Sequence, residues 1–293
     1  MRKPTLWLIA IAVIAVAAVA FIRISDDEPG IAAPPTTSGT DTSTSSTSST
    51  STTMTVSSTA PPVTLPPGVG ACDVYSSIID VGVVQSEGLI EASGMAVSRV
   101  DETVLWSHND SGDDARLYAF DTTGTSLGVF DVPGALAFDW EDMAAGPGPD
   151  GTGSYLYVGD IGDNFYIRGG RIAVYRVPDA DPRTMGSEFD EVVALTYEYP
   201  DDIYNAEAFF IDPVEPALYI VTKDKRKTLV FKGPITMTDG TVELELVAML
   251  RLDSEVSGAD ISWDGGVIAL RGYRSVWMWT RTEGSTIQDA LAG

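Results

Sequence analysis

The sequence has little sulfur, little imidazole and little positive charge. Of its 293 residues one is cysteine (Cys72) and one is histidine (His108), while 18 Lys and Arg are outnumbered by 42 Asp and Glu, a formal net charge of −24. One cysteine permits no intrachain disulfide and no cysteine zinc cluster. The negative charge would repel phosphates, so we expect no nucleic-acid partner. A Ser-His-Asp triad would depend on His108, and no G-x-S-x-G elbow supplies its serine.

Helical periodicity is confined to the N-terminus, where residues 6–22 form an uninterrupted apolar run after Arg2 and Lys3. At about 1.5 Å per residue this run would span roughly 26 Å as a helix, close to the thickness of a hydrocarbon core. We expect residues 1–24 to be a signal anchor, a single transmembrane helix that places the rest of the chain outside the cytoplasm. A cleaved signal peptide with small residues at Ala18-Val19-Ala20, and a secreted product, is the alternative.

The next segment, residues 25–70, is rich in Ser, Thr and Pro and holds almost no large apolar side chain. Such a segment buries too little surface to offset its ordering entropy, so we expect a disordered stalk. Residues 71–293 are then enough for one well-cored domain. Cys72 stands at the start of this domain, where it could be buried or pair with another molecule.

A degenerate motif occurs four times within residues 71–293. It begins at Ala92 as ASGMAVSRVDETVLWSHND and returns from Trp140, Ala206 and Gly258. Each copy reads as a short apolar run, a turn rich in Gly, Pro or Asp, and a second β-type run. A third run with an aromatic residue follows, and a fourth run precedes each copy. Repeats of about 50 residues that contain four strands are typical of a β-propeller, so we expect an all-β fold.

Four repeats predict a ring of four four-stranded blades. After the third run of the last repeat only TEGSTIQDALAG remains, so the last blade lacks an outer strand of its own. We expect residues 74–84 to complete that blade and close the ring, which would remove an exposed sheet edge. A part of a larger propeller is the alternative.

Several short segments resemble known propellers. The pieces Glu91-Ala92-Ser93-Gly94-Met95-Ala96, Leu156-Tyr157-Val158-Gly159-Asp160 and Leu218-Tyr219-Ile220-Val221-Thr222 are similar to units of six-bladed propellers of the NHL, TolB and gluconolactonase or regucalcin type. The ordered set HNDSGD, DWEDMA, GDIGDN, NAEA and GADIS also resembles exported actinobacterial propeller proteins. The resemblance covers most of residues 71–280. It implies a divalent cation on the propeller axis held by Glu, Asn and Asp, and Glu91 and Asn205 match those positions. It departs at the C-terminus, where such proteins have more blade sequence.

The repeats also align acidic and amide side chains on the expected inner strands. Alignment on Met95, Met143, Phe209 and Ile261 places Ser93, Glu141, Glu207 and Ala259 two residues earlier, and Glu91, Asp139, Asn205 and Ser257 four residues earlier. Residues two apart on a strand share a face, so these side chains could converge at the mouth of the channel. Oxygen ligands suit a hard cation, Ca²⁺ or Mg²⁺. The predicted metal ligands are Glu91, Asp139, Glu141, Asn205 and Glu207.

A second group of polar residues ends the second strands. It is not an EF-hand, because Ala115 stands where that loop needs Gly and Asp121 where it needs Glu. Asx turns explain these residues as well as ligand binding does. The candidate binding residues in this group, with one from the fourth repeat, are His108, Asn109, Asp110, Asp160, Asp163, Asn164 and Asp260.

These observations predict an extracytoplasmic, membrane-tethered propeller that binds a small molecule or a protein, with or without a divalent cation. The alternative function is a metal-dependent hydrolase of lactonase or phosphoester type, with Glu91, Glu141 and Glu207 as ligands or base. The sequence leaves open whether the protein is an enzyme.

Overall fold

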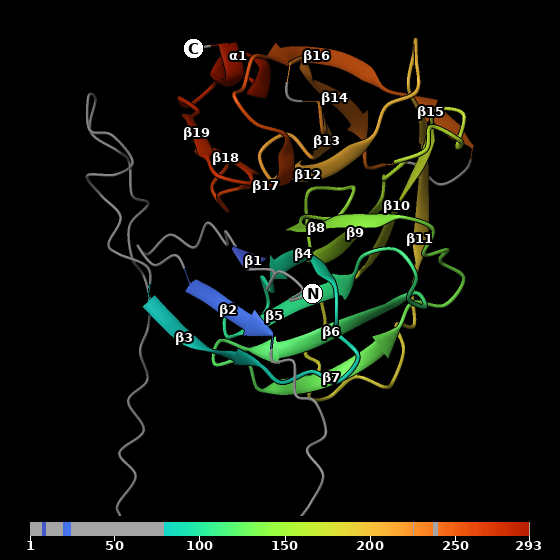
Figure 1. Ribbon diagram of the computed structural model, residues 1–293, viewed down its shortest axis with the longest axis vertical. Helices are drawn as coiled ribbons and strands as arrows, with labels where there is room; N and C mark the ends of the chain where they lie inside the picture. The colour runs from blue at the N-terminus through green and yellow to red at the C-terminus, as the bar shows by residue number, and fades with distance from the viewer. Residues whose placement is uncertain (1–7, 10–19, 25–78, 225, 237–239, 293) are drawn as a thin grey trace, which may run out of the picture.

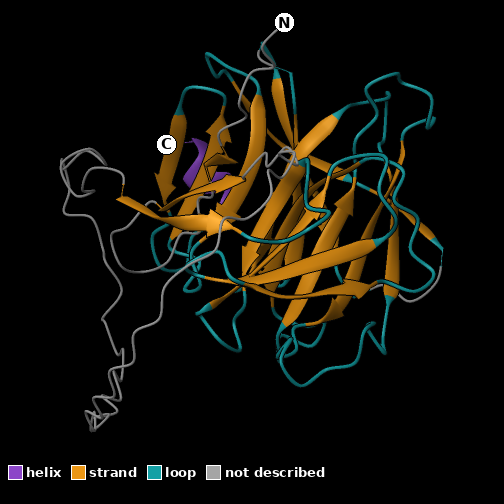
Figure 2. Cartoon of the chain, turned by 60° about the horizontal axis from the view of Figure 1, so that its bottom comes forward, coloured by secondary structure: helices purple, strands orange, loops and turns teal. Residues whose placement is uncertain are grey.

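The computed structural model describes residues 8–9, 20–24, 79–224, 226–236 and 240–292. Within these ranges the chain is built of β-strands and loops, with one six-residue helix, α1 (Ile287–Ala292) (Figure 2). The all-β prediction is therefore confirmed for the described residues.

From residue 92 onward the strands form four sheets in sequence order (Figure 1). The first contains β4 (Ala92–Val97), β5 (Val104–Asn109), β6 (Arg116–Asp121) and β7 (Ser126–Asp131). The second contains β8 (Trp140–Gly146), β9 (Tyr155–Asp160), β10 (Arg171–Pro178) and β11 (Val193–Glu198), with β15 (Thr241–Glu243) added in parallel to β11. The third contains β12 (Ala206–Asp212), β13 (Ala217–Thr222), β14 (Thr228–Pro234) and β16 (Glu245–Leu250). The fourth contains β17 (Val256–Ile261), β18 (Val267–Gly272) and β19 (Val276–Thr280).

The burial of the strands explains their sequences. The second strands β5 (VLWSHN) and β13 (ALYIVT) are buried at every position. Neighbouring sheets cover both faces of β13, whereas β5 packs against the second sheet on one face and against Val84 and Leu89 on the other. The apolar run in β13 is typical of a strand buried on both faces, whereas the outer strand β7 (SLGVFD) is exposed or half-buried at five of its six positions. Three apolar clusters fill the spaces between successive sheets. In one of them Trp106 of the first sheet packs against Phe189, in the loop between β10 and β11 of the second sheet, with ring centroids 5.7 Å apart. Each sheet is thus a blade packed face to face against the next.

The inner strands are neighbours in chain order, as a propeller requires: β4 lies beside β8, β8 beside β12, and β12 beside β17. The first and fourth blades also touch, since the Arg99 guanidinium donates to the Trp263 carbonyl at 3.2 Å and lies 5.6 Å from the centre of that ring. The predicted arrangement of four blades is confirmed.

The strand expected to complete the fourth blade does not do so. The described part of residues 74–84 is β3 (Ile79–Val84), which pairs in parallel with β2 (Ala20–Ile24). Gln85 follows β3 directly and donates its N–H to the Gly124 carbonyl at the turn between β6 and β7. Because the short segment after Gln85 leads straight into β4, β3 is held beside the first blade. That prediction is wrong for residues 79–84, and residues 74–78 lie outside the described ranges.

The predicted anchor and stalk lie largely outside the described residues. Those described within residues 1–24 form β1 (Leu8–Ile9) and β2, which pair with each other. Among the helices that the structure describes, none is long and apolar enough to cross a membrane. The signal anchor and the stalk stay predictions.

Candidate functional site

One end of the ring gathers most of the predicted site residues. Because strand direction alternates within each sheet, the inner strands all begin at the end where the β5–β6, β9–β10 and β13–β14 loops lie. We call this end the mouth. It is made from loops of different blades, so residues far apart in sequence meet there.

Each inner strand carries a β-bulge near its start. The bulge inserts one extra residue, so its side chain does not follow the regular alternation of side chains between the two faces of the sheet. The pairing register shifts between Trp140 and Asp142, between Ala206 and Ala208, and between Val256 and Gly258. The residues at the bulges, Glu141, Glu207 and Ser257, are therefore equivalent. The predicted alignment of the fourth repeat was two residues too far along, because Ala259, and not Ile261, occupies the position of Met143 and Phe209.

Three carboxylates converge at the mouth. Asp110 follows β5, Asp139 precedes β8, and Glu141 lies in the bulge of β8; one oxygen from each lies within 4.8 Å of the other two. We call them the acidic triad. Asp139 and Glu141 are buried, at 7% and 5% exposure, and Asp110 is half-buried. Gly162 leaves them room, because a Cβ there would lie 2.4 Å from Asp139 Oδ2 and 2.5 Å from Glu141 Oε1.

Glu141 is the electrostatically unusual member of the triad. Burial, and then the negative charges of Glu207, Asp110 and Asp139, raise the pKa of Glu141 to about 10. Burial and the charge of Asp110 also raise the pKa of Asp139. The charge of Lys223 opposes the rise for Glu141 only in part, and within the described part of the chain the Glu141 carboxylate makes no hydrogen bond and no direct ion pair. It therefore holds a proton at neutral pH unless a cation lies beside it.

Glu207 lies near the triad but has a partner of its own. Lys223, just after β13, forms an ion pair with the Glu207 carboxylate. Burial raises the pKa of Glu207 while Lys223 opposes the rise, and contact with Glu207 raises the pKa of Lys223 against its own burial. The pair is nearly neutral, so Glu207 is less available to a ligand than the triad is.

Two amides connect the β9–β10 loop to the triad. The Asn205 side chain accepts the Asp163 N–H at 2.7 Å and donates to Asn164 Oδ1 at 3.1 Å. Asn164 in turn donates to Asp139 Oδ2 at 3.5 Å. Asn205 thus positions a loop beside the triad.

Two aspartates of the second blade have structural partners. Asp160 is buried and accepts hydrogen bonds from Arg168 at 2.7 Å and from the Asp139 N–H at 3.0 Å. Asp163 accepts the N–H groups of Ile167 and Arg168, four and five residues further along the chain, and so closes the loop with its side chain. These contacts order the loop from residue 161 to residue 170.

The structure does not bring the remaining predicted residues into the triad. The Glu91 side chain is exposed, and its carbonyl accepts the Asp110 N–H. Asn109 clamps the preceding loop by accepting the N–H groups of Ile90 and Glu91. His108 is fully buried, with Nδ1 2.8 Å from the Asn109 carbonyl oxygen, and burial lowers its pKa. Asp260 lies on β17, where its charge acts on Arg99.

Asp142 is a central residue that lies outside the set of site residues predicted from the sequence. One carboxylate oxygen accepts the N–H groups of Phe209 on β12 and Ala259 on β17, both at 3.1 Å, so Asp142 ties three inner strands together. Burial above all raises its pKa to about 8. The equivalent residues in the other repeats are Gly94, Ala208 and Gly258. The available signal in the sequence was one acid at a position where the other three repeats have Gly or Ala.

No protein-family model matches the sequence, and no curated protein is significantly similar to it. Among solved structures, an auxiliary nutrient binding protein from Bacteroides thetaiotaomicron VPI-5482 matches with TM-score 0.41 and 10% identity over 66% of this chain and 39% of that one. The Dos1 propeller matches with TM-score 0.34 and 14% identity over 68% and 50%. Chaetomium thermophilum Sqt1, bound to the N-terminus of a ribosomal protein, matches with TM-score 0.35 and 17% identity over 64% and 46%.

The chain spans less than two thirds of the length of each of these proteins. At these low TM-scores the similarities carry no inference about function, and the propeller assignment rests on the sheets themselves. Membership in the NHL, TolB or gluconolactonase-like class stays a prediction.

Proposed function

We propose that the protein is a binding module whose mouth holds a divalent cation in the acidic triad and a ligand beside it. Glu141 carries the proposal. A buried carboxylate without a partner is costly, and a shared cation would offset the cost for all three carboxylates at once.

The spacing of the triad fits Ca²⁺. Calcium takes oxygen ligands at 2.3–2.6 Å, so two ligands on opposite sides of the ion are about 5 Å apart. The triad oxygens, all within 4.8 Å of one another, can share such an ion. Magnesium takes oxygen ligands at 2.0–2.1 Å, demands near-octahedral geometry and usually keeps several waters, so it is the second candidate ion. The triad offers only oxygen, which favours a hard cation over zinc or copper.

Apolar side chains next to the triad supply a surface for the ligand. Phe138 precedes Asp139 and is 53% exposed, and in the β9–β10 loop Phe165 is 82% and Ile167 is 67% exposed. This loop is ordered by Asp163, and Tyr166 within it has φ of 55°, the one non-glycine residue with positive φ among the described residues. A loop held in a costly conformation so that its apolar side chains stay in solvent is typical of a binding surface.

Calorimetric titration of the EDTA-treated full chain with CaCl₂ and then MgCl₂ tests the cation. We expect Ca²⁺ to bind the wild type and not Glu141→Gln. Glu91→Gln is the matched control, because it removes an exposed carboxylate that the family resemblance favours and the triad does not include. Absence of binding to the wild type would reject the cation. If Glu141→Gln and Glu91→Gln lost Ca²⁺ binding to the same extent, the ion would not be held by the triad.

The exposed apolar surface formed by Phe138, Phe165 and Ile167 is tested separately with Phe165→Ala. This side chain is 82% exposed, so its loss should leave the melting temperature and Ca²⁺ affinity unchanged. We expect it to weaken binding of any ligand recovered from a small-molecule or peptide panel. A ligand that binds both proteins equally would place the ligand surface elsewhere.

The alternative hydrolase function has less support at this site. Glu207 is ion-paired with Lys223 and His108 is fully buried, so neither is a free general base. Assays of the Ca²⁺-loaded chain with a lactone and phosphoester panel test this alternative. Membrane tethering is a further part of the proposal, and N-terminal sequencing of the mature protein tests it, since a start near Phe21 would show cleavage.

A further inference from the structure

Among the strands that the structure describes, the fourth blade has an edge with no partner strand. The first three sheets have at least four strands each, whereas the fourth has β17, β18 and β19, and within the described residues β18 is the only strand paired with β19. In Figure 1, β19 lies on the outside of this sheet. Its sequence is VWMWT, with strong β-formers, no proline and no charge. Natural edge strands are normally protected by proline or charged side chains, and β19 has neither, so this edge is suited to pairing with another strand.

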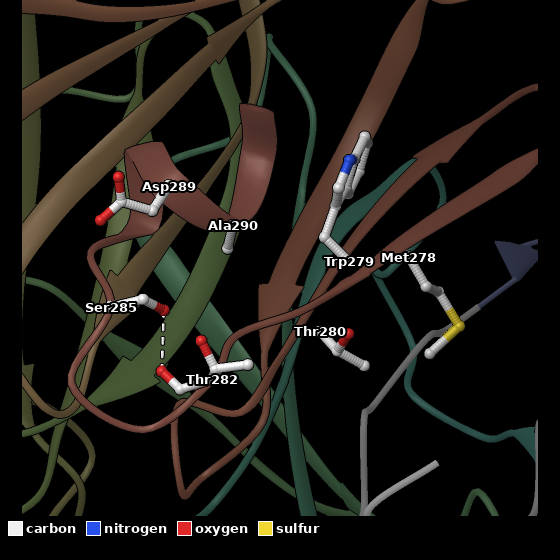
Figure 3. A pocket seen from close by; sticks show the side chains of 7 residues that line it. All are labelled: Met278, Trp279, Thr280, Thr282, Ser285, Asp289 and Ala290. Atoms are coloured by element: carbon white, nitrogen blue, oxygen red, sulfur yellow. Dashed lines mark hydrogen bonds between the residues drawn. The ribbon is translucent and has the colours of Figure 1, made fainter. Parts of the chain in front are cut away.

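The hydrogen-bond pattern shows which residues face outward. Arg281 donates to the Gly266 carbonyl and Gly272 donates to the Ser275 carbonyl, on either side of the β18–β19 ladder. Antiparallel pairs alternate, so Trp277 and Trp279 bond to β18 while Val276, Met278 and Thr280 direct their N–H and C=O groups to the open edge. Met278 and Thr280 also line an open cavity of about 480 Å³, together with Thr282 and Asp289 (Figure 3).

We propose that this edge pairs with the same edge of a second copy of the chain, antiparallel about Met278, to form a two-fold dimer. The sequence is self-complementary in that register. Met278 lies opposite Met278 of the second copy with its outward N–H and C=O groups, and Val276 lies opposite Thr280. Trp277 of each copy lies opposite Trp279 of the other, which gives two aromatic pairs across the strands, and such pairs stabilise sheets. A two-fold axis requires such self-complementarity.

The charges around the edge favour the same register. A chain with net charge −24 repels its own copies over most of its surface, but residues 276–280 are uncharged. Arg274 and Glu283 flank the strand and are both exposed. In the proposed register Arg274 of each copy comes next to Glu283 of the other, which gives two ion pairs between the copies. The second copy is therefore a better occupant of the edge than an unrelated acidic protein.

Disulfide trapping in the full chain tests this register, with Cys72→Ser as background. Residues in a hydrogen-bonded antiparallel pair have Cα atoms about 5.5 Å apart, within disulfide range. We expect Met278→Cys to give a covalent dimer on mild oxidation. Val276→Cys is the matched control: its symmetry mate is four residues along the strand, about 13 Å away. Adding Thr280→Cys to Val276→Cys should restore the covalent dimer. A monomer for Met278→Cys, or equal trapping of Val276→Cys alone, would overturn the proposal.

Light scattering on the full chain gives a second test. Met278→Pro removes one outward N–H and leaves the bonds between β18 and β19, since proline is tolerated on edge strands. We expect this variant to lose the dimer that the wild type forms, with the same circular dichroism spectrum. A variant that stays as dimeric as the wild type would show that association uses another surface.

Discussion

Replacement of Glu141 by Gln should stabilise the protein at neutral pH when no divalent cation is present. The folded state raises the pKa of Glu141 from 4.5 to about 10, so between these values the folded chain holds a proton that the unfolded chain has lost. The stability of the wild type therefore falls as pH rises through this range. The cost grows by about 1.4 kcal/mol per pH unit above 4.5 and reaches about 3 kcal/mol at pH 7. Gln is neutral and of similar size, so it avoids the cost.

The assay is urea unfolding in EDTA at pH 5, 7 and 8.5, repeated with excess CaCl₂. We expect Glu141→Gln to be more stable than the wild type at pH 7, with a flatter dependence on pH. Added Ca²⁺ should stabilise the wild type, because a ligand that binds the folded state raises its stability, and should leave Glu141→Gln unchanged.

Glu207→Gln is the control with the opposite expected sign. It stands at the equivalent bulge of the next blade, but its removal leaves Lys223 without its partner, and that side chain is 24% exposed. We expect a loss of about 1 kcal/mol at pH 7. If Glu141→Gln were destabilised in EDTA as Glu207→Gln is, the carboxylate would have a stabilising partner and the cation argument would fail.

Three further outcomes follow from the fold. Asp142→Ala leaves the N–H groups of Phe209 and Ala259 unpaired and should cost about 3 kcal/mol in urea unfolding. Asp212 and Arg281 form a buried ion pair, with Arg281 donating to Asp212 Oδ1 at 2.8 Å. Asp212→Asn leaves the Arg281 charge uncompensated and should lower the free energy of unfolding by about 3 kcal/mol, and adding Arg281→Leu should recover part of that loss. Gly162→Ala should weaken Ca²⁺ binding at least tenfold in calorimetry, because the new methyl group would contact both Asp139 and Glu141; unchanged affinity would place the ion elsewhere.

Much of the blade structure could be predicted from the sequence, because strand pairing here is local. Each blade is a series of hairpins between consecutive strands, and its second strand is a continuous apolar run such as Leu218 to Val221. Local alternation and turn residues therefore predict the strands and their order. The position of residues 79–84 could not be predicted in this way. Pairing across a ring depends on where the ends meet in space, and β3 lies beside the turn at Gly124 instead.

The candidate site was predicted in part. Asp139 and Glu141 were expected at the mouth as metal ligands and Asp110 as a separate binding residue, and the structure brings the three together. Glu91 was expected among them, but its side chain is exposed. The fourth repeat was misaligned because the residue equivalent to Met143 and Phe209 is the small Ala259, and the first large apolar side chain, Ile261, lies two residues further along the strand. Asp142 was not among the predicted site residues because its role depends on backbone N–H groups of two other blades.

The sequence by itself determined the repeat, the strands of each blade, the acidic character and the residue types available for a site, since these depend on composition and on neighbours along the chain. Only the tertiary structure decided which acids meet, that Lys223 forms its direct ion pair with Glu207, and that among the described strands β19 pairs with β18 alone. Those outcomes depend on which blades lie side by side and on how deeply each group is buried. Contacts between residues about 16 to 120 positions apart determine the neighbouring blades and the burial of each group, and no local pattern in the chain records these contacts.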